Sequence, residues 1–119
     1  MKRIFLLNGI IECLVGLIFI VRPETLFIGG AIETKALFIT KMFGMLAMSF
    51  GGLSLVIARH GNEEKLYQFS ALIIIVYHLL IAFQSYGVFV GGMLPNLGPF
   101  YLHLVLALLF VILYLKNKK

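Results

Sequence analysis

Apolar residues fill four long stretches of the sequence, and shorter, more polar segments separate them. The stretches cover about 4–21, 36–58, 66–89 and 99–115. Each is close to the roughly 17–25 residues that an α-helix needs to cross a bilayer. Pro23 ends the first stretch, because proline disfavours helical geometry at the preceding residue and breaks the helix itself. The pattern predicts an all-α integral membrane four-helix bundle that forms one domain, residues 1–119.

Small residues recur along one face of the second stretch. They follow each other at intervals of four and three, and are Thr40, Gly44, Ala47, Gly51, Ser54 and Ala58. Because small side chains let helix backbones approach closely in a membrane, we expect the other helices to pack on this one. Gly9 and Gly16, seven apart on the first helix, offer a similar seam that could serve a homodimer, and the sequence leaves the oligomeric state open.

Composition and charge are consistent with a membrane protein. Hydrophobic residues make up 61% of the chain and charged residues 13%, more apolar surface than a soluble domain of this size can bury. The net charge is +5, but the basic residues lie at the ends of the stretches, so we expect membrane lipid and no nucleic acid as partner. If both termini are cytoplasmic, seven of the ten Lys and Arg residues lie inside. The positive-inside rule predicts that orientation.

Glu12 lies at the middle of the first predicted span, where a bare carboxylate is costly. The other helices must therefore shelter it with polar groups or a wet cavity. Asn8 lies four residues earlier and shares its helix face. One interpretation is that a neutral Glu12 bonded to Asn8 only fixes helix assembly. The other is that Glu12 forms part of a binding site.

Further polar residues lie inside the other three spans. Tyr77 and His78 lie at the centre of the third, and Gln84 lies two turns closer to its outer end. Lys41 and His103 lie in the outer thirds of the second and fourth, although Lys41 can also extend to the outer surface. Ionisable groups inside spans usually face the bundle interior and mark a site. We therefore predict an outward-opening pocket that binds a ligand through Glu12, His78, His103, Asn8, Tyr77, Gln84 and Lys41.

Glu12, His78 and His103 also have the side-chain types of a zinc site. Counting 1.5 Å per helical residue, however, separates the two histidines by about 6 Å in depth. Local ligand spacing such as HxxxH is also absent. The sequence therefore predicts no metal site. The chain lacks G-x-S-x-G, P-loop, Rossmann and C-x-x-C motifs, so no catalytic residue or cofactor is assigned.

The pattern resembles the DoxX-like group of small four-helix bacterial membrane proteins. The similar parts are the glycine-bearing first helix, Gly9 to Pro23, and the opening of the second helix, Lys41-Met42-Phe43-Gly44 through Gly51-Gly52. Histidines in the third and fourth helices also fit the group. The resemblance implies a compact bundle in the bacterial inner membrane, in some cases partnered with redox or quinone-linked proteins. It carries over no agreed catalytic residues.

Three functions follow as hypotheses. The leading one is a membrane protein whose intramembrane polar pocket binds a small or lipid-like ligand. The second is a proton-coupled small-molecule transporter in which Glu12 exchanges a proton for substrate. The third is an accessory or assembly subunit of a membrane complex, with a partner membrane protein.

Overall fold

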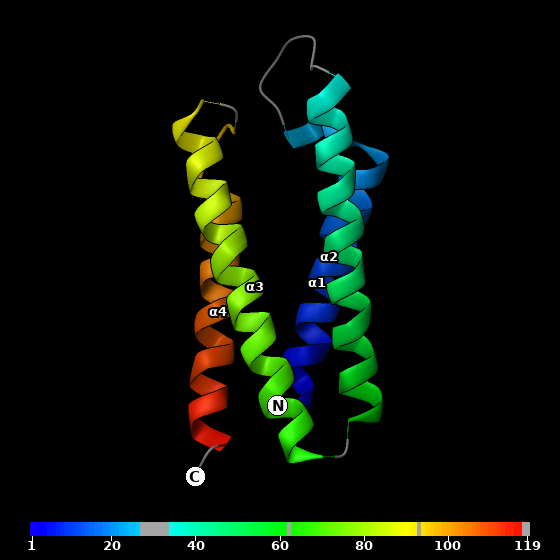
Figure 1. Ribbon diagram of the computed structural model, residues 1–119, viewed down its shortest axis with the longest axis vertical. Helices are drawn as coiled ribbons and strands as arrows, with labels where there is room; N and C mark the ends of the chain where they lie inside the picture. The colour runs from blue at the N-terminus through cyan, green and yellow to red at the C-terminus, as the bar shows by residue number, and fades with distance from the viewer. Residues whose placement is uncertain (27–33, 62, 93, 118–119) are drawn as a thin grey trace.

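Four long helices make up almost all of the computed structural model (Figure 1), which describes residues 1–26, 34–61, 63–92 and 94–117. Strands are absent from these residues. The helices are α1 (Lys2–Val21), α2 (Thr34–His60), α3 (Glu64–Val90) and α4 (Gly98–Asn117), with a short 3-10 helix η1 (Pro23–Leu26) after α1. All four long helices are long and apolar enough to span a membrane. The four predicted stretches are confirmed, with boundaries within two residues of those expected.

The helix ends follow from local chemistry. Arg22 closes α1 by donating its backbone N–H to the Ile18 carbonyl, and η1 begins at Pro23, as the proline predicted. At the other end of the bundle, the Tyr67 hydroxyl donates to the Gly61 carbonyl at 2.6 Å and lies 3.3 Å from the Ile57 carbonyl. The Ile57 carbonyl lies in the last turn of α2 and also accepts the Gly61 N–H, and Gly61 directly follows the helix, where intrahelical partners run out. Tyr67 of α3 thus caps α2 and fixes the turn between them.

Close backbone contact joins α1 to α2, and glycines make it possible. A Cβ on Gly16 would lie 2.6 Å from the Gly44 carbonyl oxygen, and a Cβ on Gly44 would lie 2.7 Å from the Gly16 oxygen. Gly9 and Gly51 face each other in the same way, at 2.9 and 3.0 Å. Any larger residue would push the two helices apart.

These contacts test both predicted seams. The seam on α2 is confirmed as buried at Thr40, Gly44, Ala47, Gly51 and Ser54. Its partner is α1, which contributes Gly9 and Gly16, the glycines considered for a dimer. Both are buried inside the chain, because the contact with α2 already covers them.

The end of the bundle at which α1 begins and α4 ends is here called the terminal end (Figure 1). A cluster of buried apolar side chains fills it. Phe5 and Phe110 are fully buried there, with ring centroids 5.1 Å apart in an edge-to-face arrangement. Ile74 and Tyr67 of α3 complete this core. The opposite end, where α1 ends and α4 begins, is called the distal end. There the α1–α2 pair stands apart from the α3–α4 pair.

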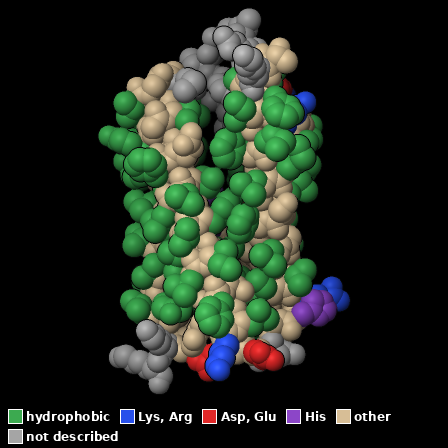
Figure 2. All heavy atoms as spheres, viewed as in Figure 1, with side chains coloured by type: hydrophobic (Ala, Val, Ile, Leu, Met, Phe, Trp, Pro, Cys, Tyr) green, Lys and Arg blue, Asp and Glu red, His purple; other side chains and the backbone are tan. Residues whose placement is uncertain are grey.

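Large apolar side chains cover the sides of the bundle, and charged side chains gather near its two ends (Figure 2). Phe83 is 78% exposed, and Phe38, Phe69, Val21 and Val90 are all exposed by 64% or more. A soluble monomer rarely exposes apolar surface on this scale. The surface therefore has the character of one that faces lipid.

Candidate functional site

Six polar side chains from all four helices meet between the terminal core and the distal end. We call them the polar cluster: Asn8 and Glu12 of α1, Ser54 of α2, Tyr77 and His78 of α3, and His103 of α4. All are buried, and Asn8, Ser54 and His78 are inaccessible to solvent. Buried polar groups of this kind are costly unless they bond to one another. The predicted shelter for Glu12 is thus present, and it comes from side chains.

Asn8 connects α1 to two other helices. Its Nδ2 donates to the Ser54 Oγ of α2 at 3.0 Å, and its Oδ1 lies 2.7 Å from the His78 Nε2 of α3. With Nδ2 directed at Ser54, Oδ1 is left to accept, so Nε2 of His78 carries the proton. The Nδ1 of His78 then presents a lone pair to the centre of the cluster.

Two histidines and Glu12 converge at that centre. The Nδ1 atoms of His78 and His103 lie 2.9 Å apart. The Glu12 Oε1 lies 3.7 Å from each of these nitrogens, too far for a hydrogen bond. Oε1 has no hydrogen-bond partner among the described residues although Glu12 is only 1% exposed. A buried acceptor left in this state needs an explanation.

Tyr77 holds the other carboxylate oxygen. Its hydroxyl donates to the Glu12 Oε2 at 2.7 Å. Its ring stacks on Phe50 of α2, with centroids 4.2 Å apart and planes inclined by 18°. Because the ring is fixed by stacking, the hydroxyl fixes the carboxylate, and Oε1 is left directed at the histidines.

The sequence-based separation of the two histidines is wrong. It measured depth from the centres of the predicted spans 66–89 and 99–115, as if both centres lay at one level, whereas α3 has 27 residues and α4 has 20. Depth has to be counted from the terminal end, where α3 begins and α4 ends. His78 lies 14 residues after Glu64, the first residue of α3, and His103 lies 14 residues before Asn117, the last residue of α4. At equal rise per residue the two side chains reach the same depth. The depth difference therefore does not exclude a metal site made of Glu12, His78 and His103.

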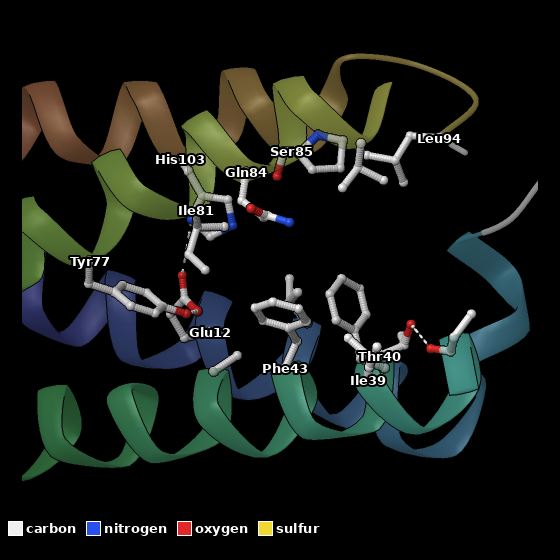
Figure 3. A pocket seen from close by; sticks show the side chains of 16 residues that line it. Glu12, Ile39, Thr40, Phe43, Tyr77, Ile81, Gln84, Ser85, Leu94 and His103 are labelled. Atoms are coloured by element: carbon white, nitrogen blue, oxygen red, sulfur yellow. Dashed lines mark hydrogen bonds and ion pairs between the residues drawn. The ribbon is translucent and has the colours of Figure 1, made fainter. Parts of the chain in front are cut away.

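A cavity of about 320 Å³ extends from the polar cluster to the distal end, between the two helix pairs (Figure 3). Glu12, Tyr77 and His103 line its inner end, and Leu94 and Pro99 line it near the start of α4. Its walls are mostly apolar. In Figure 3, Tyr77 and His103 point toward the Glu12 carboxylate while aliphatic and aromatic side chains face the open space.

The predicted site residues divide into four groups in the structure. Glu12, Tyr77 and His103 belong to the polar cluster and line the cavity. Asn8 and His78 belong to the polar cluster but do not line the cavity, and Gln84 lines the cavity outside the cluster. Lys41 is exposed and is not among the lining side chains, although its neighbours Thr40 and Phe43 are. Lys41 therefore does not line this cavity, because its position on α2, one residue after Thr40, turns it away.

Two residues of the site, Ser54 and Phe50, were not predicted from the sequence. Ser54 was assigned only to the small-residue seam, yet it accepts the Asn8 amide. A signal existed, because a hydroxyl in a seam that packs on α1 has to face the polar residues of α1. Phe50, which stacks on Tyr77, carried no such signal, since phenylalanine is frequent throughout the chain.

No family model, no curated protein and no solved structure matches this chain. The fold and site therefore define it as a bundle of four apolar helices with a polar cluster at its centre. The cluster offers a carboxylate, two imidazoles and a phenol at the end of an apolar cavity. Such a site combines apolar walls with a few fixed polar groups, as small-molecule sites do.

Proposed function

We propose that this chain is a multi-pass protein of the bacterial inner membrane that binds a small lipid-like ligand in the cavity above Glu12. Both termini face the cytoplasm in this proposal, because the basic residues of the terminal end favour that side. The cavity then opens toward the outer surface. Membership of the DoxX-like group is part of the proposal and rests on the first-helix motif and the two histidines.

One observation carries the proposal: the cavity ends on a buried carboxylate oxygen that lacks a partner. A ligand with a hydroxyl or amine at one end would donate to the Glu12 Oε1, and its apolar part would lie along the walls. The volume of about 320 Å³ is at the lower end of the range for ligand pockets, roughly 300–1,000 Å³. A saturated chain of about ten carbons therefore fits, since a water-sized group occupies about 30 Å³.

A carrier is supported less well than a binding protein. Transport needs access to the site from both sides in turn, and the terminal end below the polar cluster is closed by Phe5, Phe110 and Ile74, each at most 1% exposed. A proton-coupled carrier would have to separate these side chains in every cycle. Binding requires only the cavity as it stands.

The test uses a photoactivatable diazirine derivative of 1-decanol, incubated with the purified chain in detergent and mapped by mass spectrometry. We expect labelling on cavity-lining residues and competition by excess 1-decanol. Val88→Phe fills the cavity, because Val88 is half-buried and lines it. It should reduce labelling at least fivefold. Val105→Phe makes the same change on α4, where Val105 is 53% exposed and outside the lining, and should leave labelling unchanged.

Two results would reject the proposed function. One is labelling spread over lipid-facing residues without competition by 1-decanol. The other is equal labelling of the Val88→Phe and Val105→Phe variants, provided both keep the helical circular dichroism of the parent chain.

A further inference from the structure

Three atoms of the polar cluster have the spacing of a metal site. The Nδ1 atoms of His78 and His103 and the Oε1 of Glu12 form a triangle with sides of 2.9, 3.7 and 3.7 Å. The point equidistant from all three lies about 2.0 Å from each. Zinc binds histidine nitrogen at about 2.0–2.1 Å and carboxylate oxygen at about 2.0–2.2 Å. We infer that Glu12, His78 and His103 bind a divalent transition metal ion, and that zinc fits them best.

The two sides of the triangle that join Oε1 to the histidines favour tetrahedral over octahedral coordination. They are 3.7 Å long, nearer the ligand separation of about 3.3 Å in a tetrahedral zinc site, whereas the 2.9 Å side between the two histidines is shorter and would have to lengthen by about 0.4 Å. Two histidines and one carboxylate also bind iron(II), but on one face of an octahedron. With bonds of about 2.1–2.2 Å, ligands in that arrangement are about 3.0–3.1 Å apart. The separation of Glu12 from both histidines is too large for it.

The surrounding hydrogen bonds already orient two of the three ligands. Asn8 accepts from the Nε2 of His78, which leaves the Nδ1 lone pair free. Tyr77 donates to the Oε2 of Glu12, which leaves Oε1 free. Outer partners of this kind fix the tautomer and direction of metal ligands. A metal ion would also explain why Oε1 has no hydrogen-bond partner. A hydrogen bond between the two imidazoles would account for the 2.9 Å contact of their Nδ1 atoms, but it would not account for a carboxylate oxygen directed at both of them.

The fourth coordination position would face the cavity. Glu12 and His103 line the cavity and His78 lies behind them, so the open side of the ion is the ligand side. Three protein ligands with one open position are typical of zinc that binds an exchangeable group. A divalent ion beside one carboxylate leaves a net charge of +1, which is costly inside a membrane. An anionic fourth ligand removes that charge, so with the metal bound the cavity would take an apolar chain ending in a carboxylate or thiolate, in place of the hydroxyl or amine that would donate to Oε1 in the metal-free chain. This choice of ligand rests on the proposed function, whereas the metal site stands on its own geometry.

The experiment uses the full chain, purified in detergent with an affinity tag free of histidine and stripped with a chelator. Cobalt(II) is titrated as the spectroscopic probe, and bound zinc is measured by elemental mass spectrometry after dialysis. We expect one metal ion per chain and the intense visible bands of tetrahedral cobalt. His103→Gln should lower the affinity at least 100-fold. His60→Gln, which changes an exposed histidine at the end of α2, should leave it unchanged.

A second variant separates metal binding from folding. Tyr77→Phe keeps all three ligands and the stacked ring, and removes only the hydrogen bond to Oε2. Loss of such an outer partner lowers metal affinity by about 10- to 100-fold. The metal site is rejected if the parent chain is folded, as judged by circular dichroism, and yet binds no more cobalt than the His103→Gln variant. Equal loss of binding in His60→Gln would indicate a surface site and would also reject it.

The same preparation distinguishes this inference from the proposed function. With zinc bound, a diazirine derivative of decanoate should label the cavity more strongly than the 1-decanol derivative, and chelation should reverse the order. Cobalt binding without cavity labelling by either probe would support the metal site and reject the proposed function. Cavity labelling by the 1-decanol derivative without any metal binding would support the proposed function and reject the metal site.

Discussion

Gly44→Ala tests whether the glycine contacts between α1 and α2 hold the bundle together. The new Cβ would lie 2.7 Å from the Gly16 carbonyl oxygen and 2.9 Å from atoms of Phe19 and Ile20. Ordinary van der Waals contact begins at 3.4 Å, so the helices must separate by about 0.7 Å at this point. The nearest atom belongs to the backbone of α1, so a change of side-chain rotamer cannot relieve the overlap.

Two opposing effects set the magnitude. Overpacking of this kind costs about 1–3 kcal/mol. Alanine also gains up to about 1 kcal/mol over glycine in a helix interior. Gly52→Ala is the matched control, because it lies on the same helix and its added Cβ would meet no atom within 4 Å. Since the helix-propensity gain is common to both variants, their difference isolates the packing cost. We expect Gly44→Ala to be about 1–3 kcal/mol less stable than Gly52→Ala.

The assay is reversible unfolding in mixed micelles, followed by far-ultraviolet circular dichroism because the chain has no tryptophan. Gly52→Ala should be equal to the parent chain or slightly more stable. If the free energies of unfolding of the two variants agree within about 0.5 kcal/mol, the close approach of α1 and α2 does not limit stability. The reasoning from the Gly16–Gly44 contact would then be refuted.

Three further predictions concern the polar cluster and the topology. Ser54→Ala removes the acceptor of the Asn8 amide and should lower the unfolding free energy by about 0.6–1.7 kcal/mol. The control Ser49→Ala loses only a hydrogen bond to its own helix and should lower the unfolding free energy by less in the same assay. Tyr77→Phe should cost a similar amount, because the stacking on Phe50 is kept and one hydrogen bond to Glu12 is lost; an unchanged unfolding free energy would show that this bond is not formed. In a Cys13→Ser background, a membrane-impermeant maleimide should label Glu24→Cys in intact cells and Lys116→Cys only after permeabilisation, and the reverse pattern would contradict the proposed orientation.

Much of the fold was predictable because it depends on local properties of the chain. Each helix coincides with an apolar stretch, and Pro23 ends α1, since hydropathy and backbone geometry act over one segment at a time. The α2 seam was also readable, because small residues at helical spacing have few other uses. Its partner was not, since Gly9 and Gly16 have the same pattern whether they pack on α2 or on a second chain.

The sequence predicted that a buried polar site exists and named most of its residues, but it did not predict how they are arranged. Glu12 in the middle of an apolar span had to be sheltered, and the available partners were few, so Asn8, Tyr77, His78 and His103 could be named in advance. Lys41, like His103, is an ionisable residue in the outer third of its predicted span, but its direction on α2 excludes it from the cavity.

The sequence by itself therefore determined that this chain forms four apolar helices and must shelter an acid among them. Only the tertiary structure decided how the helices are aligned along their axes. That alignment brings His78 and His103 to one level beside the Glu12 Oε1, and it turns an apparent mismatch in depth into a set of three converging ligands. The reason is physical: hydropathy is a property of each helix alone, whereas axial alignment depends on the packing of helices of unequal length.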